Sequence, residues 1–321
     1  MNFLFKLKTK TPADLVKVLN EQTSKLALSE SKTKAEIEKC TSSMLSILQD
    51  SNLDKKKIYT TDVLVKLIPK LYKIKFESRK EISLIYCILI KRKVGNREPT
   101  VEYLTKRPSI LKDIIKGYAY NESAIFCGAM LRESIKHESL LDIVLDSPEF
   151  YLFFEYVEAD NFDIASDAFA NFRDALIRFK PRVCKFLIDE YEKFFSYYDK
   201  LLVSKNYVIK RQSLKLLGEI LLERKNFNVM TKYINNSDNL VMIMKSLADK
   251  SKSIQYEAFH IFKIFVANPN KTAAVYTILK NNKSKLISFL MNFQTDKDSD
   301  EQFRDEKAFL VKELKKVDDS G

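Results

Sequence analysis

Apolar residues recur at the spacing of an α-helix along almost the whole chain of 321 residues. Few stretches alternate between apolar and polar residues, and no Asn-Gly or Asp-Gly pair marks a β-hairpin. Near the N-terminus, Thr11 supplies a capping hydroxyl, Pro12 a favourable first helical residue, and Asp14 an acidic group in the first turn. The pattern predicts an all-α fold with short polar connectors.

Three segments align with one another in steps of 45 residues: 162–172, 207–217 and 252–262. The aligned positions share a large aliphatic residue, a small residue and a large apolar residue (Ile164, Ile209 and Ile254; Ala168, Ser213 and Ala258; Phe172, Leu217 and Phe262). Two earlier segments, 81–90 and 122–131, extend the series in steps of 41 residues with weaker matches. Such periods are typical of HEAT and armadillo repeats.

A unit of two or three helices cannot cover both of its apolar faces alone, so such units stack into a solenoid with a continuous core. The chain is therefore predicted to form an armadillo/HEAT-like helical-repeat solenoid. Because no low-complexity linker interrupts the series, we expect a single elongated domain over residues 1–321. Its repeats are expected between an N-terminal cap and a C-terminal helix, near residues 75–115, 116–157, 158–202, 203–247 and 248–290.

Prolines agree with this division of the chain. Five of them fall between the expected units or at their edges, where a helix break is tolerated (Pro99, Pro108, Pro148, Pro181 and Pro269). Pro69 lies inside an apolar run and predicts a helix start or a kink.

The composition excludes several kinds of enzyme. The five glycines stand apart, so the chain has neither a GxGxxG loop nor a Walker loop. His137 and His260 have no Cys or His neighbour at metal-ligand spacing, and we expect both to be structural, with His137 late in a helix. No nucleophile, base and orienting group can be combined. The sequence predicts a protein that is not an enzyme and has no cofactor.

One acidic stretch resembles a calcium-binding loop. Asp296, Asp298 and Asp300 occupy positions 1, 3 and 5 of an EF-hand. However, Glu301 replaces the turn-forming glycine, and Lys307 replaces the bidentate glutamate. We expect no metal site here and interpret the stretch as a solvated connector before a last helix.

No run of 18 or more uncharged apolar residues occurs, so no helix is expected to enter a membrane. Lysines interrupt the apolar start too early for a signal peptide. The four cysteines include no CxxC pair and are expected to be reduced thiols in a helical core (Cys40, Cys87, Cys127 and Cys184). These features indicate an intracellular protein, which we expect in the cytoplasm.

Charge is unevenly distributed along a chain of formal net charge +12. Residues 1–120 carry a net +12, residues 121–180 a net −7 and residues 200–285 a net +11. The last block also contains aromatic side chains among its cations, including Tyr207 and Phe227. Such a strip suits an acidic partner surface or peptide, and nucleic acid is the alternative.

Seven stretches carry long matches to one known family: Phe162–Phe169, Asn206–Glu219, Met230–Ile234, Phe265–Lys271, Pro99–Tyr103, Met130–Glu133 and Asp300–Phe303. By these stretches the chain resembles the calcium-binding protein 39 (mouse protein twenty-five) scaffold family, which includes fungal members. The resemblance covers nearly the whole chain and is strongest from about residue 150 to 315.

The resemblance implies an armadillo-like curved horseshoe without enzymatic activity. It implies a scaffold whose concave face holds a sterile-twenty-like, germinal-centre-class protein kinase or pseudokinase in its active arrangement. A separate pocket is implied to receive a short Trp-Glu-Phe-like tail of the partner. In fungi, similar proteins serve a kinase network for polarity and cell separation, so a fungal member would be recruited to sites of polarised growth or division.

Matched position by position, the family pattern assigns three residues to the tail pocket (Arg211, Lys215 and Met244). Two cations suit the carboxylate of the tail, and a pliable thioether suits its aromatic rings. Arg224 and Phe227 match the kinase-contact pair, an arginine and an aromatic residue of the kind enriched in binding hot spots. Lys285 matches a further lysine of that contact face.

The chain departs from the family at Asp50–Thr61, which is too short for an additional helix that family members usually have. The first repeat is therefore expected to be trimmed. An alternative function is a helical-repeat adaptor whose basic groove takes nucleic acid or other cargo. The residues matched to the tail pocket and the contact pair favour the kinase scaffold, so nucleic acid is not the expected partner.

Overall fold

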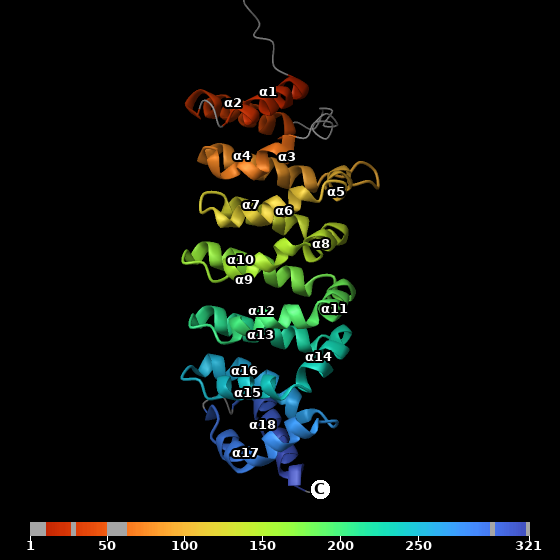
Figure 1. Cartoon of the computed structure of the whole chain (residues 1–321), viewed down its shortest axis with the longest axis vertical. Helices are drawn as coiled ribbons and strands as arrows, with labels where there is room; N and C mark the ends of the chain where they lie inside the picture. The colour runs from red at the N-terminus through yellow and green to blue at the C-terminus, as the bar shows by residue number, and fades with distance from the viewer. Residues whose placement is uncertain (1–10, 27–29, 50–62, 296–298, 319–321) are drawn as a thin grey trace, which may run out of the picture. The chain divides into compact units, whose positions relative to one another are not determined.

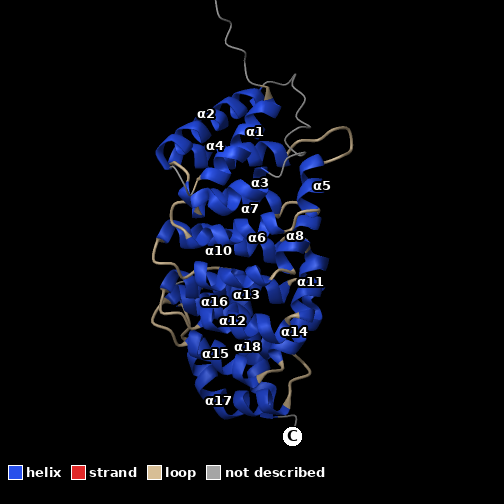
Figure 2. Ribbon diagram, turned by 45° about the horizontal axis from the view of Figure 1, so that its top comes forward, coloured by secondary structure: helices blue, strands red, loops and turns tan. Residues whose placement is uncertain are grey.

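The computed structural model describes residues 11–26, 30–49, 63–295 and 299–318. The stretches discussed at Asp50–Thr61 and Asp296–Asp298 lie outside these residues. Apart from an isolated bridge between Val94 and Arg97, the described residues form helices and loops without a strand (Figure 2). The prediction of an all-α repeat fold is confirmed.

Contacts between Cα atoms divide the chain into two compact units, residues 1–179 and 180–321. The helices of the first unit are α1 (Pro12–Lys25), α2 (Glu30–Gln49), α3 (Val63–Leu67), α4 (Phe76–Ile90), α5 (Pro99–Thr105), α6 (Ser109–Lys116), α7 (Ala124–Ser134), α8 (Glu138–Leu145), α9 (Phe153–Tyr156) and α10 (Phe162–Ile177). Those of the second are α11 (Lys180–Asp189), α12 (Tyr191–Leu202), α13 (Tyr207–Leu222), α14 (Phe227–Ile234), α15 (Ser237–Leu247), α16 (Lys252–Ala267), α17 (Ala273–Met291) and α18 (Glu301–Lys315). The single domain expected from the sequence stays a prediction.

The helix start near the N-terminus is confirmed. α1 begins at Pro12, and the hydroxyl of Thr11 accepts a hydrogen bond from the Asp14 amide at 3.3 Å. The Asp14 carboxylate in turn accepts one from the Thr11 amide at 3.0 Å, which completes a reciprocal capping box. The break predicted at Pro69 is also present, because α3 ends at Leu67 and a 3-10 turn follows over Ile68–Lys73.

The 45-residue repeat appears as three helices of equal length, α10, α13 and α16, each of 16 residues. All nine of the matched apolar and small residues are buried, with at most 3% of their surface exposed. Each helix is also capped at the equivalent position, by Asn161, Asn206 and Ser251. Burial of the same positions at the same period is the physical basis of the pattern in the sequence.

Within each unit, the repeat helices pack on their successors (Figure 1). In the first unit α2 packs on α4, α4 on α7 and α7 on α10. In the second unit α13 packs on α16, which also contacts α15 and α18. The buried apolar residues of these helices give each unit a continuous core.

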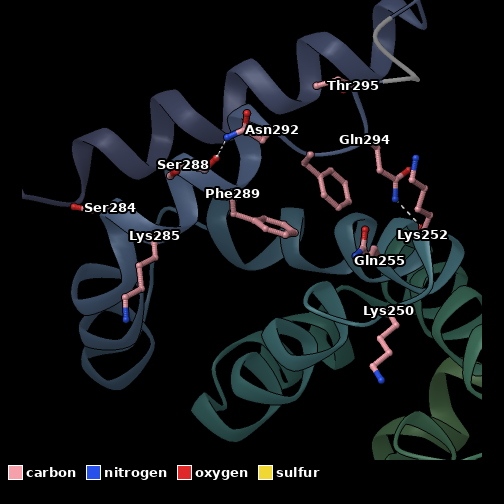
Figure 3. A pocket seen from close by; sticks show the side chains of 11 residues that line it. Lys250, Lys252, Gln255, Ser284, Lys285, Ser288, Phe289, Asn292, Gln294 and Thr295 are labelled. Atoms are coloured by element: carbon pink, nitrogen blue, oxygen red, sulfur yellow. Dashed lines mark hydrogen bonds between the residues drawn. The ribbon is translucent and has the colours of Figure 1, made fainter.

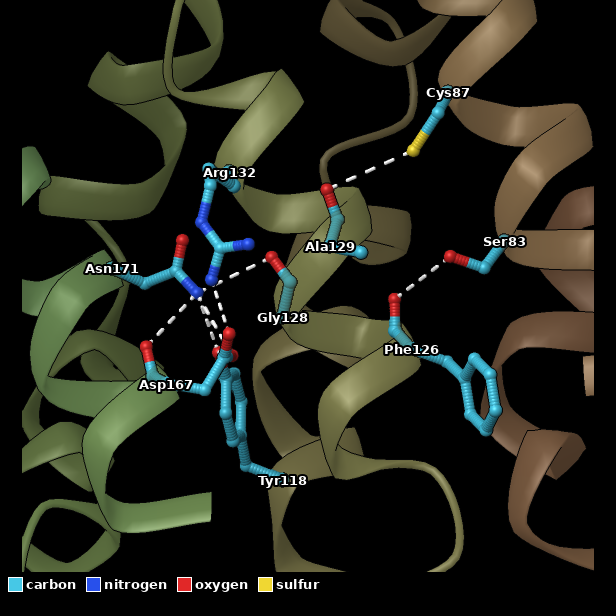
Figure 4. Close-up of polar contacts among 9 residues, drawn as sticks. All are labelled: Ser83, Cys87, Tyr118, Phe126, Gly128, Ala129, Arg132, Asp167 and Asn171. Atoms are coloured by element: carbon cyan, nitrogen blue, oxygen red, sulfur yellow. Dashed lines mark hydrogen bonds and ion pairs between the residues drawn. The ribbon is translucent and has the colours of Figure 1, made fainter. Parts of the chain in front are cut away.

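A polar network joins α7 to α10 inside the first unit (Figure 4). The Tyr118 hydroxyl donates to Asp167 Oδ2 at 2.6 Å, and Arg132 forms an ion pair with the same carboxylate. The Asn171 amide donates to the Tyr118 oxygen at 2.7 Å and to the Gly128 carbonyl at 3.2 Å. Burial and the charge of Asp167 raise the pKa of Tyr118 well above its ordinary value. Nothing in the repeat pattern indicated this network.

The four cysteines are free thiols, with Cys40 and Cys127 buried and Cys87 and Cys184 half-buried. Of the helices in the described part of the chain, none has the length and apolar character needed to cross a bilayer. The expectation for His137 is wrong in its placement. α7 ends at Ser134, and His137 precedes α8, where its Nδ1 lies 3.2 Å from a carboxylate oxygen of Glu98.

The last helix expected after the acidic stretch is α18, and Asp300 caps it by accepting from the Phe303 amide at 3.2 Å. Lys307 is 7% exposed and donates to the Phe293 carbonyl at 3.0 Å. The lysine that replaces the EF-hand glutamate thus has a structural partner of its own.

One carboxylate in the second unit, that of Asp199, loses hydration on folding without a hydrogen bond to replace it at one of its oxygens. Asp199 on α12 is half-buried, and its Oδ1 is shielded from solvent without a hydrogen-bond partner among the described residues. Burial raises the pKa of Asp199 from 3.8 to about 6. Because the folded state holds this proton more tightly than the unfolded chain, the contribution of Asp199 to stability is complete below pH 3.8 and lost as the pH rises through 6.

We therefore expect Asp199→Asn to raise the free energy of unfolding by about 1–2 kcal/mol at pH 7.5, after allowance for solvent screening of a partly exposed group. At pH 4 the gain should be much smaller, since the wild-type carboxyl is then largely protonated. Urea unfolding at the two pH values measures the difference. Asp189→Asn, at an exposed position, is the control; an equal gain for Asp199→Asn at both pH values would contradict the argument.

Candidate functional site

Two cations expected in the tail pocket share one exposed face of α13. Arg211 and Lys215 lie one turn apart, and Tyr207 lies one turn before them and is 47% exposed. Interactions of the Tyr207 hydroxyl with Ser253 and Ser251 lower its pKa and join this face to the start of α16. The helix therefore presents an aromatic ring and two cations in line.

Arg211 is not wholly available, because its guanidinium lies 3.4 Å from the carboxylate of Glu257 on α16. The Glu257 side chain is only 12% exposed, so this contact orients the arginine along the α13–α16 contact. A partner carboxylate at this face would add to that ion pair or exchange with it.

Met244 comes from a different helix, α15, and is half-buried. Its helix packs on α16, as α13 does, so α16 is the element common to the three expected tail-pocket residues. The structure thus places Arg211 and Lys215 together on one helix face, and Met244 on a separate helix that shares their packing partner.

Arg224 and Phe227 are presented by a tight turn between α13 and α14. The Glu223 carboxylate accepts from the Lys225 amide at 3.2 Å, and the Asn226 side chain donates to the Ile220 carbonyl at 2.9 Å. These bonds fix the turn, and Arg224 and Phe227 point outward from it, with Phe227 63% exposed. An aromatic ring that remains this exposed at the start of a helix is a candidate contact residue.

Phe227 stands in the wall of an apolar cavity of about 470 Å³. The wall comes from the end of α13, from α14, from the end of α16 and from the loop after it (Leu222, Phe227, Met230, Thr231, Ile234, Asn235, Lys263, Ile264, Ala267, Asn268, Pro269 and Asn270). Lys263, the cation of this wall, is paired with Glu306 at 2.6 Å. Leu222 is 58% exposed and adds a second apolar side chain to the rim.

Lys285 lies elsewhere in the second unit. It lines a cavity of about 900 Å³ between the start of α16 and the second half of α17 (Figure 3). This cavity shares no lining residue with the one that holds Phe227. None of the three expected tail-pocket residues lines either cavity.

Part of the basic block is neutralised within the second unit. Lys210 pairs with Asp249 at 2.6 Å, and Lys232 pairs with Glu192 at 2.7 Å while its ammonium also lies 4.0 Å from the centre of the Tyr191 ring. These partners reduce the field that a long polyanion would experience along the block. Localised contacts therefore describe this surface better than a uniform basic strip.

The sequence alone did not indicate several lining residues. Met230, Ile234 and Ile264 show ordinary helical spacing, and only packing of α14 against its neighbours turns them toward one cavity. Of the residues that line this cavity, only Phe227 was given a contact role from the sequence.

Known proteins resemble this chain over most of its length. The model of the family described as Mo25-like matches residues 3–318. A calcium-binding protein 39-like protein of Mus musculus is 46% identical over 326 residues, covering 97% of this chain and 96% of that protein. A Mo25-like protein of Schizosaccharomyces pombe is 43% identical over 329 residues, covering 99% of this chain and 100% of that protein. The conidiophore development protein hymA of Emericella nidulans is 38% identical over 282 residues, covering 79% of this chain and 73% of that protein.

Proposed function

This chain belongs to the Mo25-like family, and from that premise we propose that it is a non-catalytic scaffold for a protein kinase. The partner is a sterile-twenty-like, germinal-centre-class kinase or pseudokinase, which the scaffold binds and activates. It acts in the cytoplasm and, in a fungal cell, at sites of polarised growth or division.

The observation that carries the proposal is the exposed pair Arg224 and Phe227 on a hydrogen-bonded turn, beside an apolar cavity. The hydrogen-bonded turn fixes the backbone beneath the arginine and the aromatic ring, so binding costs little backbone entropy. They can therefore act as anchors for the small lobe of the kinase. The surrounding apolar wall would exclude water from this contact.

Activation is a shift between two states of the kinase. A surface that binds the active small lobe more tightly than the inactive one moves the equilibrium by that difference in affinity. A second contact, between the partner's Trp-Glu-Phe-like tail and the face that bears Arg211, Lys215 and Met244, makes docking of the small lobe intramolecular. Neither step requires a catalytic group in this chain.

A tail-binding assay separates this function from the nucleic-acid alternative. We expect Met244→Ala to weaken binding of a synthetic peptide that ends in Trp-Glu-Phe by about tenfold, because the thioether packs against aromatic rings. Fluorescence polarisation with labelled peptide measures the affinity. Met242→Ala, at another half-buried methionine of α15, is the matched control.

The same variants are compared for a single-stranded oligonucleotide over a range of salt concentrations. Nucleic-acid binding should weaken steeply with salt and be indifferent to Met244. A protein that binds the oligonucleotide tightly and ignores the peptide would reject the proposed tail contact.

A further inference from the structure

We infer that the cavity between α16 and α17 is a second docking site, which takes an acidic polypeptide segment. It lies in the second unit, has a volume of about 900 Å³, and is lined by residues of the α16 start and of the α17 end (Lys250, Lys252, Gln255, Ser284, Lys285, Ser288, Phe289, Asn292, Phe293, Gln294 and Thr295). None of the residues assigned to the tail pocket or to the Arg224–Phe227 pair lines it. Lys285, which the family pattern matches to the kinase-contact face, does lie in its wall, so the inference rests in part on the proposed function and adds an acidic ligand to it.

The charge of the lining is of one sign. Lys250, Lys252 and Lys285 contribute to the wall, and no acidic residue is among the described residues that form it. Lys250 and Lys285 are exposed and come from different elements, one just before α16 and one from α17 (Figure 3). The start of α16 adds the positive end of a helix dipole, which favours negative charge. A ligand with carboxylates complements this wall.

Besides the lysines, which donate hydrogen bonds, the lining contains side-chain amides whose oxygens can accept them. Gln255 donates to the Asp249 carbonyl at 2.6 Å, Asn292 to the Ser288 carbonyl at 2.9 Å, and Gln294 to the Lys252 carbonyl at 2.7 Å. Each amide nitrogen thus has a main-chain partner, and the amide oxygens remain as acceptors. The site therefore offers cations together with hydrogen-bond acceptors.

Gln294 is the most specific of these groups. It is 6% exposed, its Oε1 is buried without a partner among the described residues, and Figure 3 shows its side chain reaching toward Lys252 at the cavity wall. A buried acceptor without a donor costs about 1–3 kcal/mol. A ligand that brings an N–H group to Gln294 Oε1 would remove that cost.

A polypeptide meets both requirements. Its acidic side chains suit the lysines, its main-chain N–H groups suit the amide oxygens, and an apolar side chain suits the rings of Phe289 and Phe293. A nucleic-acid backbone has no N–H donor, so its phosphates would satisfy the lysines, and only a base could donate to Gln294. The lining therefore favours an acidic peptide over a polyanion without donors.

The test uses the full chain and a fluorescein-labelled glutamate-rich peptide of about ten residues that contains one tyrosine. We expect Lys250→Glu with Lys285→Glu to weaken binding at least about tenfold, since two attractions become repulsions. Lys185→Glu with Lys312→Glu changes the net charge equally at exposed lysines of the same unit that lie outside the cavity, and should stay within about twofold of wild type. Both doubles keep the core intact.

Gln294→Gly tests the acceptor. The backbone of Gln294 has φ 44°, a conformation that suits glycine, so this variant removes the amide without adding backbone strain. We expect it to weaken peptide binding severalfold and to leave the salt dependence of the peptide affinity unchanged. Lys250→Glu with Lys285→Glu should instead reduce that salt dependence. Urea unfolding of each variant checks the fold.

Four results would overturn the inference. The first is that the wild-type protein does not bind the peptide. The second is that Lys185→Glu with Lys312→Glu loses as much peptide affinity as Lys250→Glu with Lys285→Glu. The third is that an oligothymidylate of equal charge binds more tightly than the peptide and depends in the same way on Lys250 and Lys285. The fourth is loss of peptide binding in Arg211→Ala with Met244→Ala, which would assign the peptide to the tail pocket.

Discussion

Replacement of Arg224 and Phe227 together with alanine is expected to abolish activation of the partner kinase while the fold stays intact. Both side chains point outward from the turn between α13 and α14, and Phe227 is 63% exposed, so neither contributes to the core. Loss of two anchors of about 2 kcal/mol each lowers affinity by about 10³-fold. The kinase then returns to its inactive state, because the scaffold no longer favours the active one.

The measurement is a kinase assay with the partner recovered by affinity purification from the cells that produce the protein. Phe309→Ala with Lys312→Ala is the matched control, since it removes an exposed ring and an exposed cation from α18 in the same unit. Activation by the Arg224–Phe227 double at the wild-type level would show that the contact face lies elsewhere. Recovery of nucleic-acid-binding complexes without a kinase would contradict the scaffold function itself.

Gly128→Ala is expected to destabilise the first unit by about 2–4 kcal/mol. A Cβ atom at this position would collide with Asp167 Oδ2 and would lie 2.5 Å from the Tyr118 hydroxyl, far inside contact distance. The change would force α7 away from α10 and separate the carboxylate from Tyr118 and Arg132. The cost combines overpacking with loss of a buried hydrogen-bond network.

Gly218→Ala provides a matched control for that variant. Gly218 is also buried in a helix, but the nearest atom to its added Cβ is Ile261 Cγ1 at 3.9 Å, an ordinary contact. Since alanine is the better helix former, this change should be neutral or stabilise by up to about 1 kcal/mol. Urea unfolding monitored by circular dichroism compares the two. A similar small effect of both substitutions would mean that the Tyr118–Asp167 network adapts without cost.

Much of the fold could be predicted from the sequence because repeat units bury the same positions at a fixed period. Ile164, Ile209 and Ile254 are each 3% exposed, and the small and large positions of the same helices are buried as well. The caps and the kink at Pro69 are likewise local, since they depend on neighbours within a few residues. The one misplaced histidine, His137, lies beyond the end of α7 beside Glu98, a contact across about forty residues that no local pattern contains.

The candidate site was predictable only in part. The sequence placed Arg211 and Lys215 one helical turn apart, and the structure keeps them on one exposed face. It could not reveal that Phe227 borders an apolar cavity or that Lys285 lines a separate one, because residues of several helices form each wall and only packing brings them together.

By itself, the sequence determined the helical periods, their caps and breaks, the absence of glycine-rich nucleotide loops, and the uneven distribution of charge. These properties depend on residue type and short spacing, which the chain carries without folding. The tertiary structure decided which cations are paired, why Gly128 has no side chain, and that the side-chain oxygen of Gln294 is buried without a donor in the described part of the chain. Those properties arise only when packing brings distant helices to within a few ångströms of one another.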